Sequence, residues 1–314
     1  MEAKTGALQR GRIGTAAGPA RRSHPSRAVL EIARDYLTLT KPRIISLLLL
    51  TTVATMFVAD PSGPPLAIVL WTMLGGYLAA GGAGAINHYL ERDSDARMAR
   101  TSRRPLASGR ISPAHGLVFG LALGVAAAVQ LAITVNPLSA ALAVGGLLGY
   151  VFVYTLWLKP RTPQNIVLGG AAGAVPPLVG WAAATGALSA QALWPFAIVF
   201  LWTPPHFWAL SLLISEDYAR TGVPMLPVVR GEVTTRRQIL GYSVLLVAAT
   251  VAPVLTGLFG ALYLVSALAL GAGFIALALV LWARPSRAAA RRLYLSSLSY
   301  LALLFVAMAL DRAL

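Results

Sequence analysis

The sequence has no cysteine in 314 residues, and it has few charged residues. The absence of cysteine excludes disulfide bonds, iron–sulfur clusters and thiolate metal sites. Charged residues make up 12% of the chain, against roughly 25% in a typical soluble domain, and hydrophobic residues make up 57%. With a mean hydropathy of +0.70, the chain has too little polar surface to solvate a globule of this size. We therefore expect lipid to be its main solvent.

Nine apolar stretches divide the chain, and each is close to the ~20 residues that a helix needs to cross ~30 Å of hydrocarbon. They are residues 44–59, 66–90, 117–135, 138–158, 166–185, 193–214, 239–258, 262–282 and 293–310. Every backbone polar group in lipid needs an internal partner, so these stretches are expected to be helices. The predicted fold class is all-α, a polytopic membrane protein with nine transmembrane helices.

The distribution of the positive charge, which gives a net charge of +15, indicates membrane topology and not a nucleic-acid site. Of the 26 Lys and Arg residues, 25 lie before the first stretch or after an even-numbered one, and the remaining one is Arg312. This alternation predicts that the N-terminus and those connections are cytoplasmic. An independent nucleic-acid site would need a basic patch interleaved with aromatic residues, which the sequence lacks, so no nucleic-acid partner is expected.

Residues 1–35 differ in composition from the rest of the chain. They are rich in Arg, Ala, Ser and Gly and contain no apolar run. We predict a disordered, basic cytoplasmic tail at residues 1–35 and a single membrane domain at residues 36–314, in the plasma membrane of a bacterial cell. The alternative is a mitochondrial transit peptide and the mitochondrial inner membrane, because the segment is also poor in acidic residues.

Acidic residues are scarce and clustered. Five of the eleven lie in two short segments, one with Glu91, Asp93 and Asp95, the other with Glu216 and Asp217. Both segments follow even-numbered stretches. They are therefore expected to emerge on the same basic side, where they can face each other across a cavity.

The first acidic cluster has a helical spacing. Asn87, Glu91 and Asp95 follow at i, i+4 and i+8, so a continuing helix places them on one face and Asp93 on another. Three oxygen ligands on one stripe suit a hard cation such as Mg²⁺, which bridges to substrate phosphates. Basic residues able to bind an anion come next, namely Arg97, Arg100, Arg103 and Arg104. The alternative is a connection that is charged only because it is cytoplasmic.

The second acidic cluster follows a proline pair and a histidine. His206 and Asp217 are eleven residues apart, which is three helical turns and the same face of a continuous helix. Pro204 and Pro205 are expected to kink or break this helix within the membrane. A histidine at membrane depth is a candidate functional group, and we predict that His206 faces a substrate cavity. The alternative is a histidine that bonds a neighbouring helix.

Five other positions are weaker candidates for substrate contacts. Tyr154, Lys159 and Arg161 close the fourth stretch on the basic side. Asn165 opens the fifth, and its two alternative roles are a cavity residue and a helix cap. Trp208 is a candidate for the acceptor side, although packing or anchoring at the membrane interface is the commoner role of such a tryptophan.

Several motifs together resemble the UbiA superfamily of intramembrane aromatic prenyltransferases, over roughly residues 36–312. Within it, the chain is similar to the branch that farnesylates haem. The motifs are Leu39-Thr-Lys-Pro-Arg43, Asn87-x3-Glu91-x-Asp93-x-Asp95-x2-Met98-x-Arg100-Thr101, Tyr154-Thr-Leu-Trp-Leu-Lys159, Gly173-Ala-Val-Pro-Pro-Leu-Val-Gly-Trp181, Pro205-His-Phe-Trp208 and Asp217-Tyr-Ala-Arg-Thr-Gly-Val-Pro-Met-Leu-Pro227.

The resemblance implies a nine-helix bundle around a central cavity that opens to the cytoplasmic side and to lipid. It implies Mg²⁺ as cofactor, farnesyl diphosphate as donor and a vinyl group of haem B as acceptor. Implied partners are the lipid bilayer and haem A synthase or terminal oxidase assembly proteins. By position, it implies that metal and diphosphate are held by Asn87, Glu91, Asp95 and Asp217, and that phosphate charge is neutralised by Lys159, Arg161, Arg97 and Arg100.

One departure from the superfamily pattern leaves the number of metal ions open. Many members carry Asp-x3-Asp in the second motif, whereas here Leu213 stands four residues before Asp217. Two other functions remain open at this point. One is a related prenyltransferase acting on a quinone precursor or chlorophyllide, and the other is a transporter whose carboxylates bind a coupling cation.

Overall fold

The computed structural model describes residues 25–314, with side chains from residue 29, and the regular structure in this range is helical. The elements are α1 (Pro25–Thr40), α2 (Pro42–Ala59), α3 (Leu66–Ala96), α4 (Pro113–Thr134), α5 (Pro137–Leu148), the π-helix η1 (Gly149–Leu158), α6 (Asn165–Thr185), the 3₁₀ turn η2 (Ala190–Ala192), α7 (Leu193–Leu213), α8 (Ser215–Arg220), α9 (Leu226–Leu255), α10 (Ala261–Ala283) and α11 (Arg287–Ala313). In this range, nine segments are long and apolar enough to cross a membrane, which confirms the predicted fold class.

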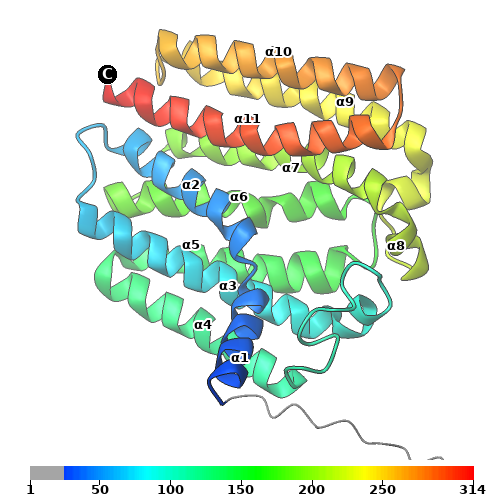
Figure 1. The fold of residues 1–314 in the computed structure, drawn as a ribbon. Coiled ribbons are helices and arrows are strands. Elements are labelled where there is room, and N and C mark those ends of the chain that lie inside the picture. The colour runs from blue at the N-terminus through cyan, green and yellow to red at the C-terminus, as the bar shows by residue number, and fades with distance from the viewer. Residues whose placement is uncertain (1–24) are drawn as a thin grey trace, which may run out of the picture.

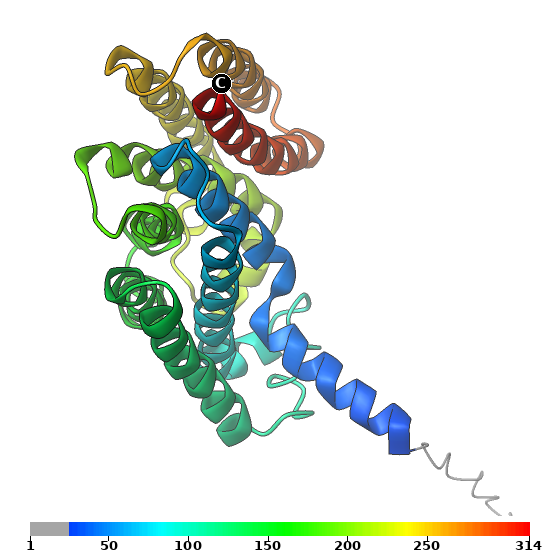
Figure 2. The same cartoon turned by 90° about the vertical axis from the view of Figure 1, so that its left-hand side faces the viewer.

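The nine spans form a closed ring. Each span packs against the next one along the chain, and α11 packs back against α2. The helix α2 also contacts α6 on the far side of the ring. It therefore separates the interior of the ring into two parts. Figure 2 shows the spans nearly end-on. The arrangement creates an interior between α2, α3, α5 and α6 that is separate from the packed core around α7, α9 and α11.

Glycines allow the closest helix contacts in this ring. A Cβ at Gly180 of α6 would collide with the carbonyl oxygen of Thr52 in α2. A Cβ at Gly82 of α3 would lie 2.8 Å from the carbonyl oxygen of Gly120 in α4. Helices in membranes pack through small residues because lipid provides no hydrophobic drive for their association. These two contacts fix α3 beside α4 and α2 beside α6.

Polar caps followed by proline or small residues start several helices. The side chains of Ser112, Asn136 and Ser286 accept hydrogen bonds from backbone N–H groups three residues later, at 3.3, 2.8 and 3.1 Å. Pro113 and Pro137 follow the first two caps, where proline costs no helical hydrogen bond. Local sequence therefore determines where these helices begin.

The connections that carry most of the Lys and Arg residues lie at one end of the bundle, here called the basic end. This end holds α8 and the connection 97–112, while the C-terminus lies at the opposite end (Figure 1). The helix α3 continues past residue 90 to Ala96, so it projects beyond the apolar part of the bundle at the basic end.

The helices α9 and α11 begin well before the positions that the hydropathy pattern predicts. The helix α9 starts at Leu226 instead of residue 239, with a non-helical Gly231 (φ 76°, ψ 167°) inside it, and α11 starts at Arg287 instead of residue 293. Hydropathy marks only the segment that lies in lipid. The helices continue beyond it into polar segments, because a helix pairs its backbone groups internally whether lipid or water surrounds it.

The predicted disordered tail, residues 1–35, falls in two parts. Residues 1–24 lie outside the described range, whereas residues 25–35 form the first part of α1. This part is helical because its apolar residues recur with helical periodicity, a pattern that a search for long apolar runs does not detect.

Candidate active site

The basic end of α3 carries the first acidic cluster on one face. Because the helix continues to Ala96, Asn87, Glu91 and Asp95 form one stripe. The side chains of Glu91 and Asp95 are 14% and 4% exposed, whereas that of Asp93 is 80% exposed. The predicted orientation of these four side chains is therefore confirmed, and their chemical roles stay predictions.

Each member of the stripe faces a cation from a different part of the chain. Lys41 Nζ donates to Asn87 Oδ1 at 2.6 Å, and Arg104 Nη1 donates to Asp95 Oδ2 at 2.7 Å. Glu91 forms an ion pair with Lys159. Buried carboxylates require such partners, since an unpaired buried charge costs several kcal/mol. The result is a compact group of carboxylate oxygens and cationic donors at one end of α3.

A hydrogen bond fixes the orientation of the Asn87 amide. Its Nδ2 donates to Thr155 Oγ1 at 3.3 Å, and Thr155 Oγ1 donates to the backbone oxygen of Tyr150 at 2.9 Å. The amide oxygen of Asn87 therefore faces Lys41. Asn87, Glu91 and Asp95 thus present oxygen atoms only, which is the donor set that a hard divalent cation prefers. The described residues 25–314 contain no group of three His, Cys, Asp or Glu side chains arranged to hold a metal.

Lys41 is a site residue that the sequence analysis missed. It is the only residue other than glycine with a positive φ in the range 25–314, with φ 58° and ψ 54°, and it immediately precedes Pro42. Non-glycine residues in this conformation are strained and concentrate at functional sites. Burial and the nearby charge of Arg104 lower the pKa of Lys41 from 10.5 to about 7. The available signal was its place in the motif Leu39-Thr-Lys-Pro-Arg43.

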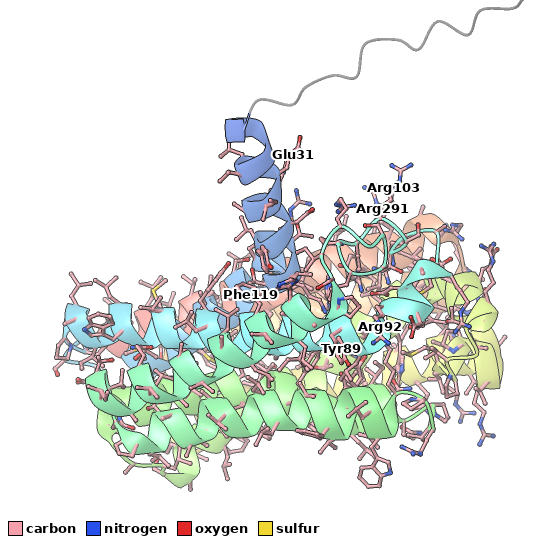
Figure 3. The ribbon with its side chains drawn as sticks, turned by 90° about the horizontal axis from the view of Figure 1, so that it is seen from below. Glu31, Tyr89, Arg92, Arg103, Phe119 and Arg291 are labelled. Atoms are coloured by element: carbon pink, nitrogen blue, oxygen red, sulfur yellow. The ribbon has the colours of Figure 1, made fainter. Side chains whose placement is uncertain are left out.

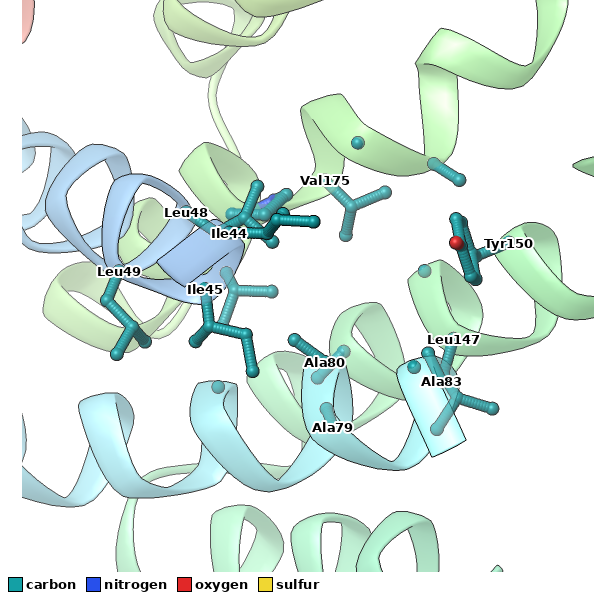
Figure 4. A pocket seen from close by; sticks show the side chains of 18 of the residues that line it. Ile44, Ile45, Leu48, Leu49, Ala79, Ala80, Ala83, Leu147, Tyr150 and Val175 are labelled. Carbon is teal, nitrogen blue, oxygen red and sulfur yellow. The ribbon is translucent and has the colours of Figure 1, made fainter. Parts of the chain in front are cut away.

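An apolar cavity of about 250 Å³ begins beside Lys41. Figure 4 shows its walls, with Ile44 and Leu48 from α2, Ala83 from α3, Tyr150 from η1 and Val175 from α6. Most of the other lining residues are aliphatic or glycine. One ligand could therefore place a charged group at the stripe and an attached hydrocarbon chain in the cavity, with Lys41 where the two parts join.

The wall carrying Tyr150 is a π-helix, which the sequence analysis predicted as part of a regular helix. In η1, Lys159 N donates to Tyr154 O at 2.9 Å, a bond across five residues instead of four. Segments of π-helix are rare and frequently occur at functional sites. The wider turn sets where Lys159 leaves the helix to meet Glu91. Tyr154, buried in the same segment, packs against Tyr150 with ring centroids 5.4 Å apart.

The second acidic cluster lies on a separate short helix. The helix α7 ends at Leu213, and Ile214 has φ −125° and ψ 24° before α8 begins. The expected common face of His206 and Asp217 is therefore wrong, because the helix does not continue between them. Of the two effects expected at Pro204 and Pro205, the break does not occur, since α7 continues through both prolines, and the kink stays a prediction.

The two carboxylates of α8 point in different directions. The side chain of Asp217 is 15% exposed and that of Glu216 is 83% exposed. Tyr218, buried on the same short helix, is close enough to carboxylates of both clusters to be affected by their charge. Burial raises the pKa of Tyr218 to about 12, a net change to which the charges of Glu91 and Asp217 add and which Arg100 and Arg104 oppose. Asp217 thus lies on the same side of the bundle as the stripe, but not within its cation-paired group.

His206 makes the contacts expected of the packing alternative. Its Nδ1 lies 2.6 Å from Ser297 Oγ in α11, and its ring stacks on Trp202 with centroids 4.1 Å apart. Ser297 Oγ donates its single proton to the backbone oxygen of Tyr294 at 2.6 Å. This arrangement favours the tautomer with a proton on Nδ1, in which Nε2 is an acceptor. A contact with the acceptor through Nε2 stays a prediction.

The remaining predicted residues differ in exposure and in their hydrogen-bond partners. Arg97 and Arg100 are exposed at the basic end. Arg161 donates to the backbone oxygens of residues 156 and 157 at the end of η1. Asn165 is buried at the start of α6, and its Oδ1 has no partner among the described residues. Trp208 is 1% exposed and packs edge-on against Tyr242, in a core position.

Residues 48–307 match the UbiA prenyltransferase family. The chain belongs to the UbiA prenyltransferase family. Among relatives, it is 54% identical over 281 residues to the Protoheme IX farnesyltransferase of Roseiflexus sp. (strain RS-1), covering 90% of this chain and 53% of that protein. It is 53% identical over 283 residues to the Protoheme IX farnesyltransferase of Symbiobacterium thermophilum, covering 90% of this chain and 95% of that protein.

The chain spans about half the length of the first of these UbiA-family relatives and nearly all of the second. The fold is also that of solved family members. A UbiA homologue from Archaeoglobus fulgidus, solved with DMAPP and Mg²⁺, aligns with a TM-score of 0.63 at 16% identity, over 87% of this chain and 99% of that chain. The predicted resemblance to the UbiA superfamily is confirmed.

Proposed function

We propose that this chain transfers the farnesyl group of farnesyl diphosphate to a vinyl group of haem B and so produces haem O. The observation that carries the proposal is the cation-paired stripe of Asn87, Glu91 and Asp95 at the mouth of an apolar cavity. About 50% identity to proteins named Protoheme IX farnesyltransferase supports the choice of donor and acceptor.

The stripe and its cations suit the binding of a diphosphate. When the anion binds, Lys41, Lys159 and Arg104 can turn from the stripe to the phosphate oxygens as charge-assisted donors. The oxygens of Asn87, Glu91 and Asp95 are then free to hold Mg²⁺, the ion present with a prenyl diphosphate in the Archaeoglobus homologue. Bound Mg²⁺ would neutralise the charge that develops on the departing diphosphate.

The cavity suits the prenyl chain. Its aliphatic walls exclude water, and Lys41 lines its polar end, where the carbon–oxygen bond to the diphosphate breaks. The diphosphate leaves with the bonding electron pair, and the vinyl group forms the new bond to the allylic carbon. Water then adds to the resulting cation beside the porphyrin and releases a proton. No protein nucleophile is required, in agreement with the absence of cysteine.

The test is a reaction with the purified full chain in lipid nanodiscs, supplied with farnesyl diphosphate, haem B and Mg²⁺. We expect a product heavier than haem B by one farnesyl group and one hydroxyl group, and no product after EDTA treatment. If haem B is recovered unchanged while a quinone precursor supplied in parallel becomes prenylated, the proposed acceptor is wrong.

We also propose that the basic end of the bundle faces the cytoplasm of a bacterial cell. The placement of 25 of 26 Lys and Arg residues on one side supports this orientation. A reporter protein that works only in the cytoplasm should be active when it is fused after residue 105. A periplasmic signal from that fusion would reverse the orientation.

A further inference from the structure

The helix α1 projects from the bundle and runs across the direction of the spans, as Figures 2 and 3 show. Its last turn is held firmly on α3. Leu39 is fully buried, Thr40 Oγ1 lies 2.9 Å from Tyr77 OH, and a Cβ at Gly84 would lie 3.0 Å from the Leu39 oxygen. The direction of α1 is therefore set by packing at its C-terminal end.

The outer turns of α1 have an exposed apolar face. Val29, Leu30 and Leu37 are 64%, 70% and 52% exposed, and Ala33 is exposed as well. At about 100° per residue, Val29, Ala33 and Leu37 fall on one side of the helix, and Glu31 falls on the opposite side. Nothing among the described residues covers this apolar face.

The polar face of α1 points to the basic end. In Figure 3, Glu31 projects toward the end of the bundle where Arg103 and Arg291 lie. On the same polar face, Asp35 accepts two hydrogen bonds from Arg110, at 2.9 and 3.0 Å, and Arg110 belongs to the connection 97–112. The apolar face of α1 therefore points back toward the level of the spans.

At that level the neighbouring bundle surface is itself apolar. Tyr36 of α1 contacts Phe119 of α4 edge-on, with centroids 4.9 Å apart. Beside it, Val118 and Val125 of α4 are both 64% exposed on a helix long and apolar enough to cross a membrane. The exposed face of α1 is thus continuous with a surface that faces lipid.

We propose that α1 docks on the membrane surface at the basic end, with its apolar face among the lipid chains and its polar face in water. A helix with one apolar and one charged face that lies in the plane of the membrane binds in this way. The residue that follows α1 is Lys41, which contacts Asn87 and lines the cavity. Docking would therefore fix the start of the site at the depth where an amphiphilic diphosphate lies.

The absence of cysteine makes the docking directly measurable. Single cysteines replace Val29, Glu31 and, as a lipid-facing reference, Val125 in the full chain, and each is labelled with a small fluorophore. The proteins are placed in nanodiscs of phosphatidylcholine and phosphatidylglycerol. Quenching by a lipid-attached nitroxide is then compared with quenching by aqueous iodide. Ala33→Cys serves as a second apolar-face position if Val29→Cys folds poorly.

We expect the label at residue 29 to follow the reference at residue 125, with strong quenching by the lipid nitroxide and weak quenching by iodide. The label at residue 31 should show the reverse. Equal iodide quenching at residues 29 and 31 would show that α1 stands in water. Protection of residue 29 from both quenchers would show that protein, such as a second copy of the chain, covers the face. Either result overturns the proposal, and neither depends on which acceptor the enzyme uses.

Discussion

The end of α3 and the junction of α7 with α8 both carry an acidic motif at the basic end, yet the chain arranges them differently. On α3 the helix continues through the motif, and Asn87, Glu91 and Asp95 each meet a cation. At the second motif the helix ends at Leu213, and Asp217 lies on a separate short helix. Spacing determines geometry only where the helix is uninterrupted, so the first motif should dominate the chemistry.

The largest expected effect is that of Glu91→Gln. The change removes the charge of a proposed Mg²⁺ ligand and leaves Lys159 without its ion-pair partner. We expect farnesyl transfer by the purified protein to fall by more than about a hundredfold, beyond the loss typical of an outer-shell partner. Asp93→Asn is the matched control, because that side chain is 80% exposed, and it should retain most activity. Full activity in Glu91→Gln would exclude the stripe from the reaction, and comparable losses in the two variants would show that the inward orientation does not decide the role.

Lys41→Met should weaken the binding of farnesyl diphosphate. A hydrogen bond to a charged group contributes about 1.5–3 kcal/mol, which corresponds to roughly a 10- to 100-fold rise in Kd. The measurement is a calorimetric titration with the unreacted diphosphate in the presence of Mg²⁺. The control is Arg43→Met, two residues away and exposed, which should bind normally. Normal diphosphate binding by Lys41→Met would show that Lys41 takes no part in binding the diphosphate.

The second motif should respond less, and only through its inward carboxylate. We expect Asp217→Asn to reduce turnover by roughly tenfold, the lower end of the loss for a supporting ligand. Glu216→Gln should have no effect, because that side chain is 83% exposed. Steady-state kinetics on the two variants decides the matter. A loss in Asp217→Asn as large as in Glu91→Gln would erase the difference between the two motifs.

His206→Ala separates an acceptor contact from a packing role. The variant loses a hydrogen bond to Ser297, so we expect a stability loss of about 1 kcal/mol and a slightly lower Tm. If Nε2 contacts haem, haem binding should also weaken several-fold with a shifted Soret band, while diphosphate binding stays normal. Ser297→Ala removes the hydrogen bond that orients the His206 ring, and it should shift the same Soret band less. Unchanged haem spectra in both variants would assign His206 to packing alone.

The parts of the structure that could be predicted from the sequence are those governed by one local rule. Hydropathy and the alternation of Lys and Arg gave the nine spans, and i, i+4, i+8 spacing gave the inward stripe on α3. The helix end at Leu213 could not be predicted, because the prolines at 204 and 205 are stronger helix-breaking signals than any residue near 213.

The pairing of Glu91 with Lys159 could not be predicted from a local rule, because the two residues are 68 positions apart in the sequence. The π-helix η1 and the left-handed conformation of Lys41 are backbone features that hydropathy and helical spacing do not report. The docking face of α1 was missed for a different reason. Its apolar residues are spread with helical periodicity through a segment whose composition resembles a polar tail.

The most direct test of the account is mass spectrometry of the haems extracted from membranes that contain the full chain, compared with membranes that contain Glu91→Gln or Asp93→Asn at equal protein levels. The account predicts a haem heavier by a farnesyl and a hydroxyl group with the unmodified chain and with Asp93→Asn, and only haem B with Glu91→Gln. The same heavier haem with Glu91→Gln, or its absence from all three membranes, would contradict it.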